Sequence, residues 1–331
     1  MSSALATIRD RARERVGGGY GGREFAQSFG IIAVGVALLI VFDLTASSFL
    51  AAGNIRNIFM QTSVIGVAAI GETIVMLTGG IDLSVGAIAF MGEVFVADLT
   101  MSGHSLGFAL TASLLACAGM GLLNGILVVV VRIEPILATL ASLLVAAGLG
   151  KLVLNLRYLQ PTNPVFGRLA TTNVIFNLPI MVVVMVGLYV VGAFVMQKTQ
   201  FGRSIYAVGG NKRAARLSGL PVARITIAAY TLAGFLYGVG GFLTVGQLGL
   251  VSQNDLASAN FQAIIAVLVG GLSVSRGGLG RIERTLIGVL IVGMMTNYQT
   301  IKGIDPAFQQ ALLGGLLFAA ILVDRLIRGR S

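Results

Sequence analysis

The sequence predicts an all-α, polytopic membrane protein, and three observations support this fold class. Hydrophobic residues make up 56% of the 331 residues. Charged residues make up only 11%, whereas an ordinary soluble domain is about 25% charged. So few charges cannot cover a surface that faces water, which excludes a soluble enzyme and a disordered chain. The apolar residues also gather in stretches that can cross a bilayer, which takes about 20 residues per helix.

We expect about ten transmembrane helices, some of them broken or re-entrant. The apolar stretches are 29–50, 58–78, 83–101, 105–131, 136–155, 178–196, 225–247, 260–275, 283–300 and 308–324. Only Gly-Gly-Ile-Asp, residues 79–82, separates the second stretch from the third, so these two could instead form one broken element. The chain is therefore expected to form one transmembrane domain over residues 29–325.

The basic residues predict the orientation of these helices. Eighteen of the 23 fall in segments on one side, both termini included, and four fall on the other side, with Lys151 inside the fifth stretch. Lysine and arginine are enriched in cytoplasmic loops, so we expect both termini in the cytoplasm. The net charge of +10 is spread over five such segments rather than gathered in one patch, which argues against nucleic acid as a partner.

The two ends of the chain are polar. Residues 1–28 predict a flexible cytoplasmic tail, and residues 326–331 a second, short one. The arginines from Arg9 to Arg15 are interleaved with Leu5, Ile8, Ala12 and Val16, which leaves open a helix lying on an anionic lipid surface.

Several kinds of chemistry have no sequence support. Cys117 and His104 are each the only residue of their type, which excludes an internal disulfide and a cysteine or histidine zinc cluster. The one Gly-Lys pair, Gly150-Lys151, lacks the surrounding pattern of a phosphate-binding loop. The chain is therefore expected to be no enzyme, to bind no cofactor or metal, and to leave any use of ATP to another subunit.

Two glycine-rich segments interrupt the apolar pattern, at residues 79–86 and 270–280. Broken helices occur in membranes where the backbone is buried in protein or lines a watery cavity. Paired breaks in the two halves of a chain indicate a translocation path between structural repeats. The path candidates are Asp82, Ser84, Gly270, Gly271, Ser273 and, farther along the chain, Asn297. For Asp82 we favour a structural role, holding the Gly-Gly turn or capping the next helix.

Glu72 and Glu93 lie deep inside predicted helices. A carboxyl group facing lipid is costly, so each must face the protein interior. They could belong to a polar translocation path or a proton site, or they could form buried hydrogen bonds between helices. The path interpretation keeps open a protein of another class, a proton-coupled secondary carrier that uses Glu72 and Glu93.

The longest cytoplasmic loop, residues 197–224, holds six basic residues and no acidic one. Asn211 can cap a short helix, Gly219 can end it in a left-handed conformation, and Pro221 prevents its continuation. This helix could dock a cytoplasmic partner, or its charges could keep the loop inside and contact anionic lipid. The candidate coupling residues are Arg203, Gly209, Gly210, Asn211, Lys212, Arg213, Ala215, Arg216 and Gly219.

Several of these segments together resemble a known family. They are Thr73–Thr78 with Gly79–Gly86, Asn124-Gly125, Arg132–Pro135, Ala138–Leu140, Thr199–Asn211, Ala214–Gly219, Ala266–Gly271, Gly277–Gly280 and Thr285–Gly288. In this order, over about residues 30–325, they resemble the ribose-type sugar permeases of ATP-binding-cassette (ABC) importers.

The resemblance implies a multi-pass permease of the bacterial inner membrane that pairs with a second copy or a paralogue. It would receive solute from a periplasmic binding protein and be driven by a cytoplasmic ATP-binding subunit, which docks on residues 211–219. The chain departs from the family pattern at Asn260-Phe261, Leu272, Arg284, Glu72 and Glu93. The substrate is therefore left open among a ribose-type monosaccharide, a deoxy sugar, a polyol and a furanose-like signal.

Overall fold

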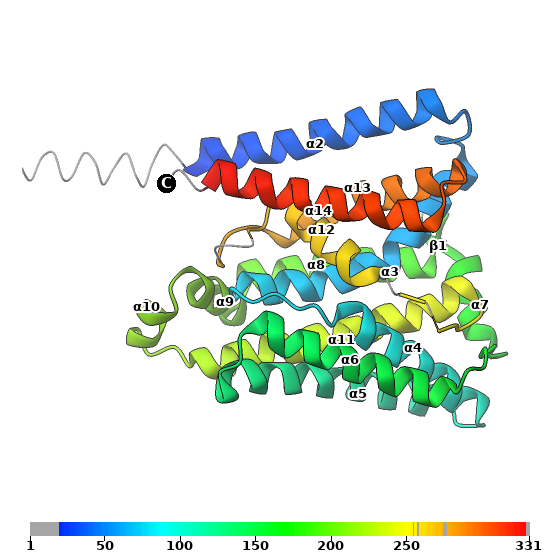
Figure 1. Ribbon diagram of the computed structural model, residues 1–331, viewed down its shortest axis with the longest axis horizontal. Coiled ribbons are helices and arrows are strands. Elements are labelled where there is room, and N and C mark those ends of the chain that lie inside the picture. Colours follow the sequence, from blue (N-terminus) through cyan, green and yellow to red (C-terminus); the bar gives the residue numbers. More distant parts are fainter. Residues whose placement is uncertain (1–19, 176, 254, 257, 274–276, 329–331) are drawn as a thin grey trace, which may run out of the picture.

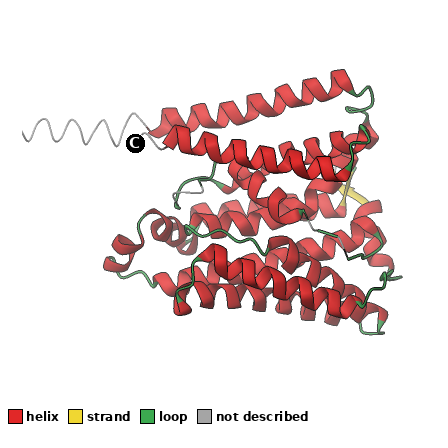
Figure 2. Cartoon of the chain, viewed as in Figure 1, coloured by secondary structure: helices red, strands yellow, loops and turns green. Residues whose placement is uncertain are grey.

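The protein is a bundle of helices lying roughly side by side, with one small β-hairpin (Figures 1 and 2). A computed structural model describes residues 20–328 except 176, 254, 257 and 274–276. In chain order the elements are α2 (Tyr20–Thr45), α3 (Ala52–Leu77), α4 (Val85–Met101), α5 (Leu106–Ile126) with the π-helical turn η1 (Leu127–Val131), α6 (Pro135–Leu154), α7 (Pro164–Thr171), β1 (Asn173–Ile175), β2 (Leu178–Pro179), α8 (Ile180–Lys198), α9 (Gln200–Gly210), α10 (Lys212–Leu217), α11 (Val222–Leu248), α12 (Ala259–Val269), α13 (Ile282–Ile301) and α14 (Pro306–Arg328).

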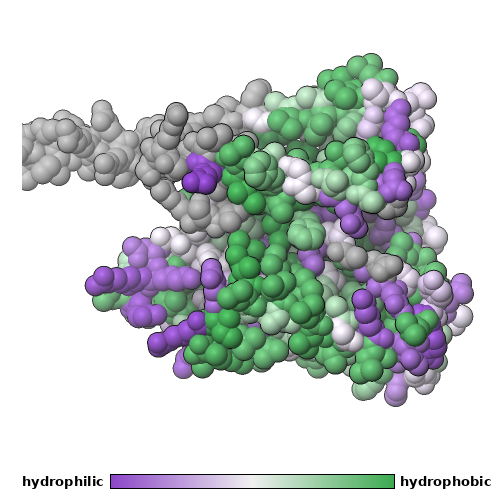
Figure 3. Space-filling model, in the orientation of Figure 1, coloured by the Kyte–Doolittle hydropathy of each residue, from purple (hydrophilic) through white to green (hydrophobic). Residues whose placement is uncertain are grey.

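The predicted class, an all-α polytopic membrane protein, is confirmed. Within the described residues, five helices are long and apolar enough to cross a membrane: α3, α5 with η1, α6, α8 and α11. Shorter apolar segments lie in α2, α12 and α14. Figure 3 shows apolar side chains across the middle of one face and hydrophilic residues at both ends. This pattern matches an apolar band inside a bilayer with two wet ends.

The interior is built around α11. This helix packs against α5, α3 and α4, while α3 also packs against α13 and α8. The large side chains of Tyr230 and Tyr237 on α11 are fully buried there. The short helices α9 and α10 lie at one end of the bundle, where α2 begins and α14 ends, and α7 and β1 lie at the opposite end (Figure 1).

The predicted short helix in the long loop is confirmed as α10. Asn211 accepts a hydrogen bond from the backbone N–H of Ala214 at 2.9 Å, which caps the helix start. Gly219 has φ +80°, the left-handed conformation that ends a helix and favours glycine.

Several predicted helix boundaries differ from the structure. The stretch expected to span residues 260–275 is helical only to Val269, because Gly270 caps α12 and Gly271 turns the chain at φ +90°. At the N-terminus, α2 already begins at Tyr20, and residues 1–19 of the expected tail lie outside the described residues. Helix α14 continues to Arg328, four residues beyond the expected end of the apolar stretch at Asp324.

Candidate translocation and coupling site

The two glycine breaks, far apart in the sequence, touch each other. The backbone N–H of Gly278 donates a hydrogen bond to the carbonyl of Leu77 at 2.9 Å. A Cβ atom on Gly277 would lie 2.7 Å from the backbone nitrogen of Gly79, closer than real side chains approach. Gly79 and Gly278 have φ +82° and +71°. Glycine is therefore required here for both backbone conformation and close approach.

The last turn of α9 completes this contact. A Cβ atom on Gly209 would collide with the Leu77 carbonyl oxygen and would lie 2.5 Å from the nitrogen of Gly278. The hydroxyl of Tyr206 donates to the carbonyl of Gly280 at 3.1 Å. We call Leu77, Gly79, Gly209, Gly277 and Gly278 the glycine junction. It joins the end of α3, the end of α9 and the loop that precedes α13.

Beside the junction, α10 projects from the end of the bundle (Figure 1). Lys212, Arg213 and Arg216 are exposed, and none of them is ion-paired within the described part of the chain. Leu217 is 82% exposed, while Ala215 is buried and anchors the helix. Basic side chains beside an exposed leucine form a surface suited to an acidic protein partner.

The remaining coupling residues differ in their surroundings. Arg203 is exposed, and its guanidinium donates to the carbonyl of Lys198 at 3.2 Å. Gly210 is exposed, and a Cβ atom there would meet nothing within 4 Å. The two adjacent glycines of α9 therefore differ completely in what surrounds them.

Behind the first break lies a buried polar network. Asp82 Oδ1 accepts from the backbone N–H of Ser84 at 2.8 Å and from the Ser84 hydroxyl. The amide of Asn124, on α5, donates to that hydroxyl at 3.0 Å. The N–H of Leu83 donates to the hydroxyl of Thr139, on α6, at 3.0 Å. The Asp82 carboxyl thus holds the turn that leads into α4.

Glu72 connects the network to two other elements. Its carboxyl accepts from the backbone N–H of Asp82 at 3.3 Å and from the hydroxyl of Tyr237, on α11, also at 3.3 Å. Glu72 and Asp82 are fully buried, and no basic side chain of the described residues pairs with either. Two interpretations of Glu72 were left open, a polar path or proton site and a buried hydrogen bond between helices. The observed geometry is a set of buried hydrogen bonds that join α3 to α11 and to the loop before α4.

Glu93 lies in a different buried place, on α4. Its backbone packs against Gly241 of α11, where a Cβ atom would lie 2.8 Å from the Glu93 nitrogen. Its carboxyl is close enough to Asp255 for the two acidic groups to interact. Asp255 in turn accepts from the N–H of Ser252 at 2.6 Å. Glu93 therefore faces the loop before α12 rather than the glycine junction.

The second break is connected to α3 through α13. A Cβ atom on Gly270 would lie 2.8 Å from the Cα of Thr285, so the chain passes close to α13 here. The hydroxyls of Thr285 and Thr73 share a hydrogen bond of 2.9 Å. Gly271 makes the turn described above, and Ser273 is buried. Thr73 is next to Glu72, which bonds Asp82 of the first break. The same turn of α3 is therefore connected to both breaks, to the first through Glu72 and to the second through Thr73 and α13.

The structure does not bring Asn297 to this site. Asn297 is buried on α13, one turn beyond Gly293, which packs against Thr62 in the first half of α3. The next residue, Tyr298, stacks on Phe42 with ring centroids 4.2 Å apart. Asn297 therefore lies toward the opposite end of the bundle from the glycine junction.

Sequence reasoning missed three polar groups of this region. Tyr237 and Thr139 are hydrogen-bonded in the network, and Asn260 accepts from the backbone N–H of Gly86. Each is a polar residue inside an apolar stretch, and this is the one sequence feature that could have identified it as a buried hydrogen-bonding group. Their partners are 56 to 174 positions away in the chain, so no local pattern identifies them.

The chain is similar to known transport permeases over most of its length. Residues 54–321 match the family model described as branched-chain amino acid transport system / permease component. The ribose import permease protein RbsC of Bacillus subtilis is 35% identical over 87% of this chain and 89% of its own length. The fructose import permease protein FrcC of Rhizobium meliloti is 32% identical over 90% and 85%. The L-arabinose ABC transporter permease protein AraH of Azospirillum brasilense is 32% identical over 91% and 88%. No solved structure matches the chain.

Proposed function

This chain belongs to the family of branched-chain amino acid transport system permease components, and we propose that its cargo is a monosaccharide or a related sugar-like solute. Family membership makes it a transporter subunit of the bacterial inner membrane rather than an enzyme. The three relatives described above are named for ribose, fructose and L-arabinose, which supports a sugar over an amino acid. The polar groups of the path and the binding protein select the substrate among a ribose-type sugar, a deoxy sugar, a polyol and a furanose-like signal.

The proposed topology has ten crossings: α2, α3, α4, α5 with η1, α6, α8, α11, α12, α13 and α14. The start of α2, the end of α14 and the basic helix α10 all lie at one end of the bundle (Figure 1). By the positive-inside rule that end is cytoplasmic, and both termini lie there. Residues 29–325 then form a single transmembrane domain.

The proposed partners follow from the two ends of this topology. A cytoplasmic ATP-binding subunit docks on α10, where Lys212, Arg213 and Arg216 attract an acidic surface. A periplasmic binding protein delivers solute at the opposite end, and a second copy or a paralogue of this chain completes the path. ATP is bound and used by the partner subunit, and the chain itself needs no cofactor.

The observation that carries the mechanism is the position of Gly209. This residue belongs to the coupling loop and yet touches Leu77, just before the first break, and Gly277-Gly278 within the second. When ATP binding closes the partner subunits, a push on α10 is transmitted through α9 to both breaks at once. Access then alternates because the two partner states favour different positions of the breaks.

In this mechanism the buried polar network holds the first break in place, while the junction transmits movement from α9 to the breaks. Glu72, Asp82 and Ser84 keep the first break in register with α5 and α11. Gly270, Gly271 and Ser273 form the second break, and Glu93 lies along the path beside the loop before α12. We assign no transport role to Asn297, since it lies far from these segments.

The first experiment is a mild-detergent purification of the tagged chain from its native host. We expect a stoichiometric ATP-binding subunit, and any paralogue present identifies a heterodimer. Recovery of the chain alone, after crosslinking has shown that the complex survives the detergent, would contradict the importer mechanism. Uptake that stops when the proton gradient is collapsed at constant ATP would favour a proton-coupled carrier, which the comparisons do not support.

The second experiment uses the adjacent glycines of α9 as a matched pair. Gly209→Ala places a Cβ atom in the junction, whereas Gly210→Ala places one in open space. In liposomes containing the complete complex, we expect Gly209→Ala to lower substrate-stimulated ATPase and uptake about 10-fold or more, with Gly210→Ala close to wild type. Equal behaviour of the two variants would contradict transmission through the junction. Should Gly209→Ala fold poorly, Tyr206→Phe tests the same contact by removing the hydroxyl that bonds Gly280.

A further inference from the structure

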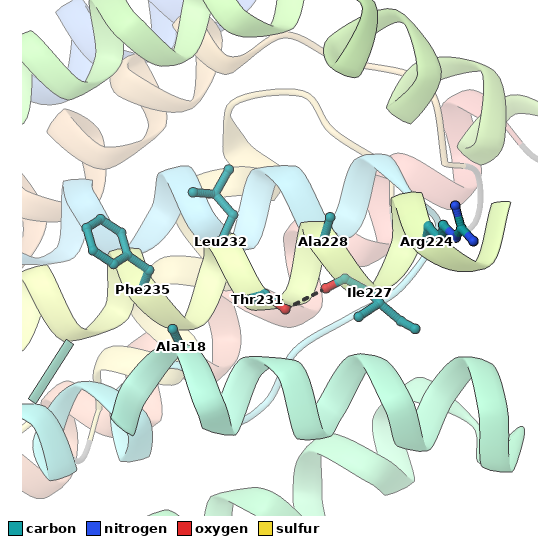
Figure 4. Close-up of a pocket in the computed structure, with 7 residues that line it drawn as sticks. All are labelled: Ala118, Arg224, Ile227, Ala228, Thr231, Leu232 and Phe235. Carbon is teal, nitrogen blue, oxygen red and sulfur yellow. Dashed lines mark hydrogen bonds between the residues drawn. The ribbon is translucent and has the colours of Figure 1, made fainter. Parts of the chain in front are cut away.

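A groove on the side of the bundle, between α5 and α11, is not used by the proposed mechanism. Its volume is about 570 Å³, within the usual range for small-molecule sites. Figure 4 shows its lining, mostly one side of α11 with one residue of α5 opposite. The lining residues are Ala118, Arg224, Ile227, Ala228, Thr231, Leu232 and Phe235.

The groove wall is apolar except at one end. The only hydroxyl, that of Thr231, is already bonded to the carbonyl of Ile227 in its own helix at 2.9 Å. The small side chains of Ala118 and Ala228 leave the space open, and Phe235, 38% exposed, closes the far end. Arg224 stands at the other end, exposed and without an ion-pair partner among the described residues. The groove thus combines a long apolar part with the exposed guanidinium of Arg224 at one end.

The neighbouring helix adds charge at the same end. Gly125 of α5 lies against Ile227 of α11, with a Cβ-to-Cα separation of 2.8 Å for an added side chain. The two helices run in opposite directions (Figure 1), so Arg132, which follows η1, lies beyond the same end as Arg224. Arg132 is also exposed and makes no ion pair within the described ranges.

The length of the groove matches one leaflet of a membrane. Arg224 and Phe235 are eleven positions apart on one helix, which at 1.5 Å per residue is roughly 16 Å. Half of a hydrocarbon core of about 30 Å is roughly 15 Å. An acyl chain lying along Ile227, Ala228 and Leu232 would reach Phe235 near the bilayer centre, with its headgroup at Arg224.

We propose that this groove binds one acyl chain of an anionic phospholipid of the cytoplasmic leaflet, with the lipid phosphate held by Arg224. The guanidinium is suited to this because it binds phosphate through two parallel N–H groups. Anionic lipids are abundant in the cytoplasmic leaflet, and Arg132 adds attraction at the same end. The inference rests on the orientation proposed above, which places Arg224 on the cytoplasmic side.

The test is native mass spectrometry of the complete permease, purified in mild detergent and titrated with phosphatidylglycerol or phosphatidylcholine. Wild type should retain one phosphatidylglycerol per chain under conditions that remove phosphatidylcholine. Arg224→Gln should lower retention of phosphatidylglycerol about 10-fold. Arg325→Gln is the matched control, because Arg325 is also exposed at this end of the bundle but belongs to α14, which packs against α12. It should retain lipid as wild type does.

A second variant probes the apolar part. Ala228→Phe fills the groove and should abolish lipid retention while elution profile and Tm stay as in wild type. Equal retention of both lipids, or of phosphatidylglycerol by Arg224→Gln and wild type, would overturn the proposal. A loss of permease dimers in Ala228→Phe, with lipid retention intact, would overturn it in favour of an interface between copies. Because lipid retention is read without transport, failure of the importer mechanism would not mimic any of these results.

Discussion

The five long apolar helices fall into two groups that behave in opposite ways. The less apolar helices, α3 and α11, are 78% and 61% buried in their most apolar windows. The more apolar ones, α5 with η1, α6 and α8, are only 28% buried. In a bilayer the lipid itself is apolar, so hydrophobicity does not drive a helix into the protein interior. A helix that carries Glu72 or Tyr237 is buried instead because only other helices offer it hydrogen-bond partners.

The glycines of a single helix, α5, also differ in whether they are packed against another helix or exposed. On α5, Gly121 faces α11, where a Cβ atom would lie 3.0 Å from the backbone carbonyl carbon of Tyr230. Gly119, two positions earlier, is exposed and has nothing within 4 Å. Gly121 therefore allows the two helix backbones to pack closely, whereas Gly119 faces away from the bundle. The same residue type has a packing role at one position and none at the other.

The largest expected effect comes from breaking the α5–α11 contact. Gly234→Val on α11 places a side chain against the carbonyl of Cys117 and 3.0 Å from the Cα of Gly121. Backbone cannot move aside as a side chain can, so we expect a loss of about 3 kcal/mol or more in unfolding free energy. Most of the variant should aggregate on size-exclusion chromatography. Gly119→Val is the control and should elute as wild type does, and similar elution of the two variants would contradict this account of the interface.

Removing the carboxyl of Glu72 should have the next largest effect. Glu72→Ala leaves the N–H of Asp82 and the hydroxyl of Tyr237 buried without their acceptor, which should cost about 2 to 3 kcal/mol. Glu72→Gln keeps an acceptor oxygen and should cost less than half as much. Thermal unfolding of the purified permease in detergent measures both. Glu134→Ala, at an exposed site, is the control, and an equal loss there would show that burial is not the cause.

A smaller effect is expected for the hydroxyl pair that links α3 to α13. Thr73→Val and Thr285→Val each remove one side of the 2.9 Å hydrogen bond, at a cost of about 1 kcal/mol. The double variant should be less destabilised than the sum of the two, because each single variant already loses the same hydrogen bond. Strict additivity of the two changes in unfolding free energy would argue that the hydroxyls act independently.

The smallest effect should come from the lipid-facing side of α8. Val190 is 64% exposed, and Val190→Ala should change the unfolding free energy by less than about 0.5 kcal/mol. On the same helix Val182 is fully buried, and Val182→Ala should cost about 1 to 2 kcal/mol through the cavity it leaves. Paired thermal melts distinguish the two sites. Equal shifts in Tm would mean that the two sides of α8 are not differently packed.

Much of the molecule was predictable from local patterns. Apolar runs and their basic flanks indicate the fold class, and the cap at Asn211 and the stop at Gly219 indicate α10. The end of α12 was placed six residues too late, because apolar residues continue past the turn at Gly270-Gly271. The Asp82 carboxyl bonds Ser84 at the entry to α4, while the path candidate Asn297 lies toward the opposite end of the bundle from the glycine junction.

Local sequence patterns establish what each segment can do in a membrane: which runs can cross, which glycines can break them and which loop carries positive charge. These properties depend on a few neighbouring residues and on the solvent, so they can be read along the chain. Helix packing determines which helices are enclosed, that Gly209 contacts Leu77 and Gly277-Gly278, and that Glu72 accepts a hydrogen bond from Tyr237. Glu72 and Tyr237, for example, are 165 positions apart in the chain. Such pairings depend on how several helices pack at once, which no single stretch of sequence specifies.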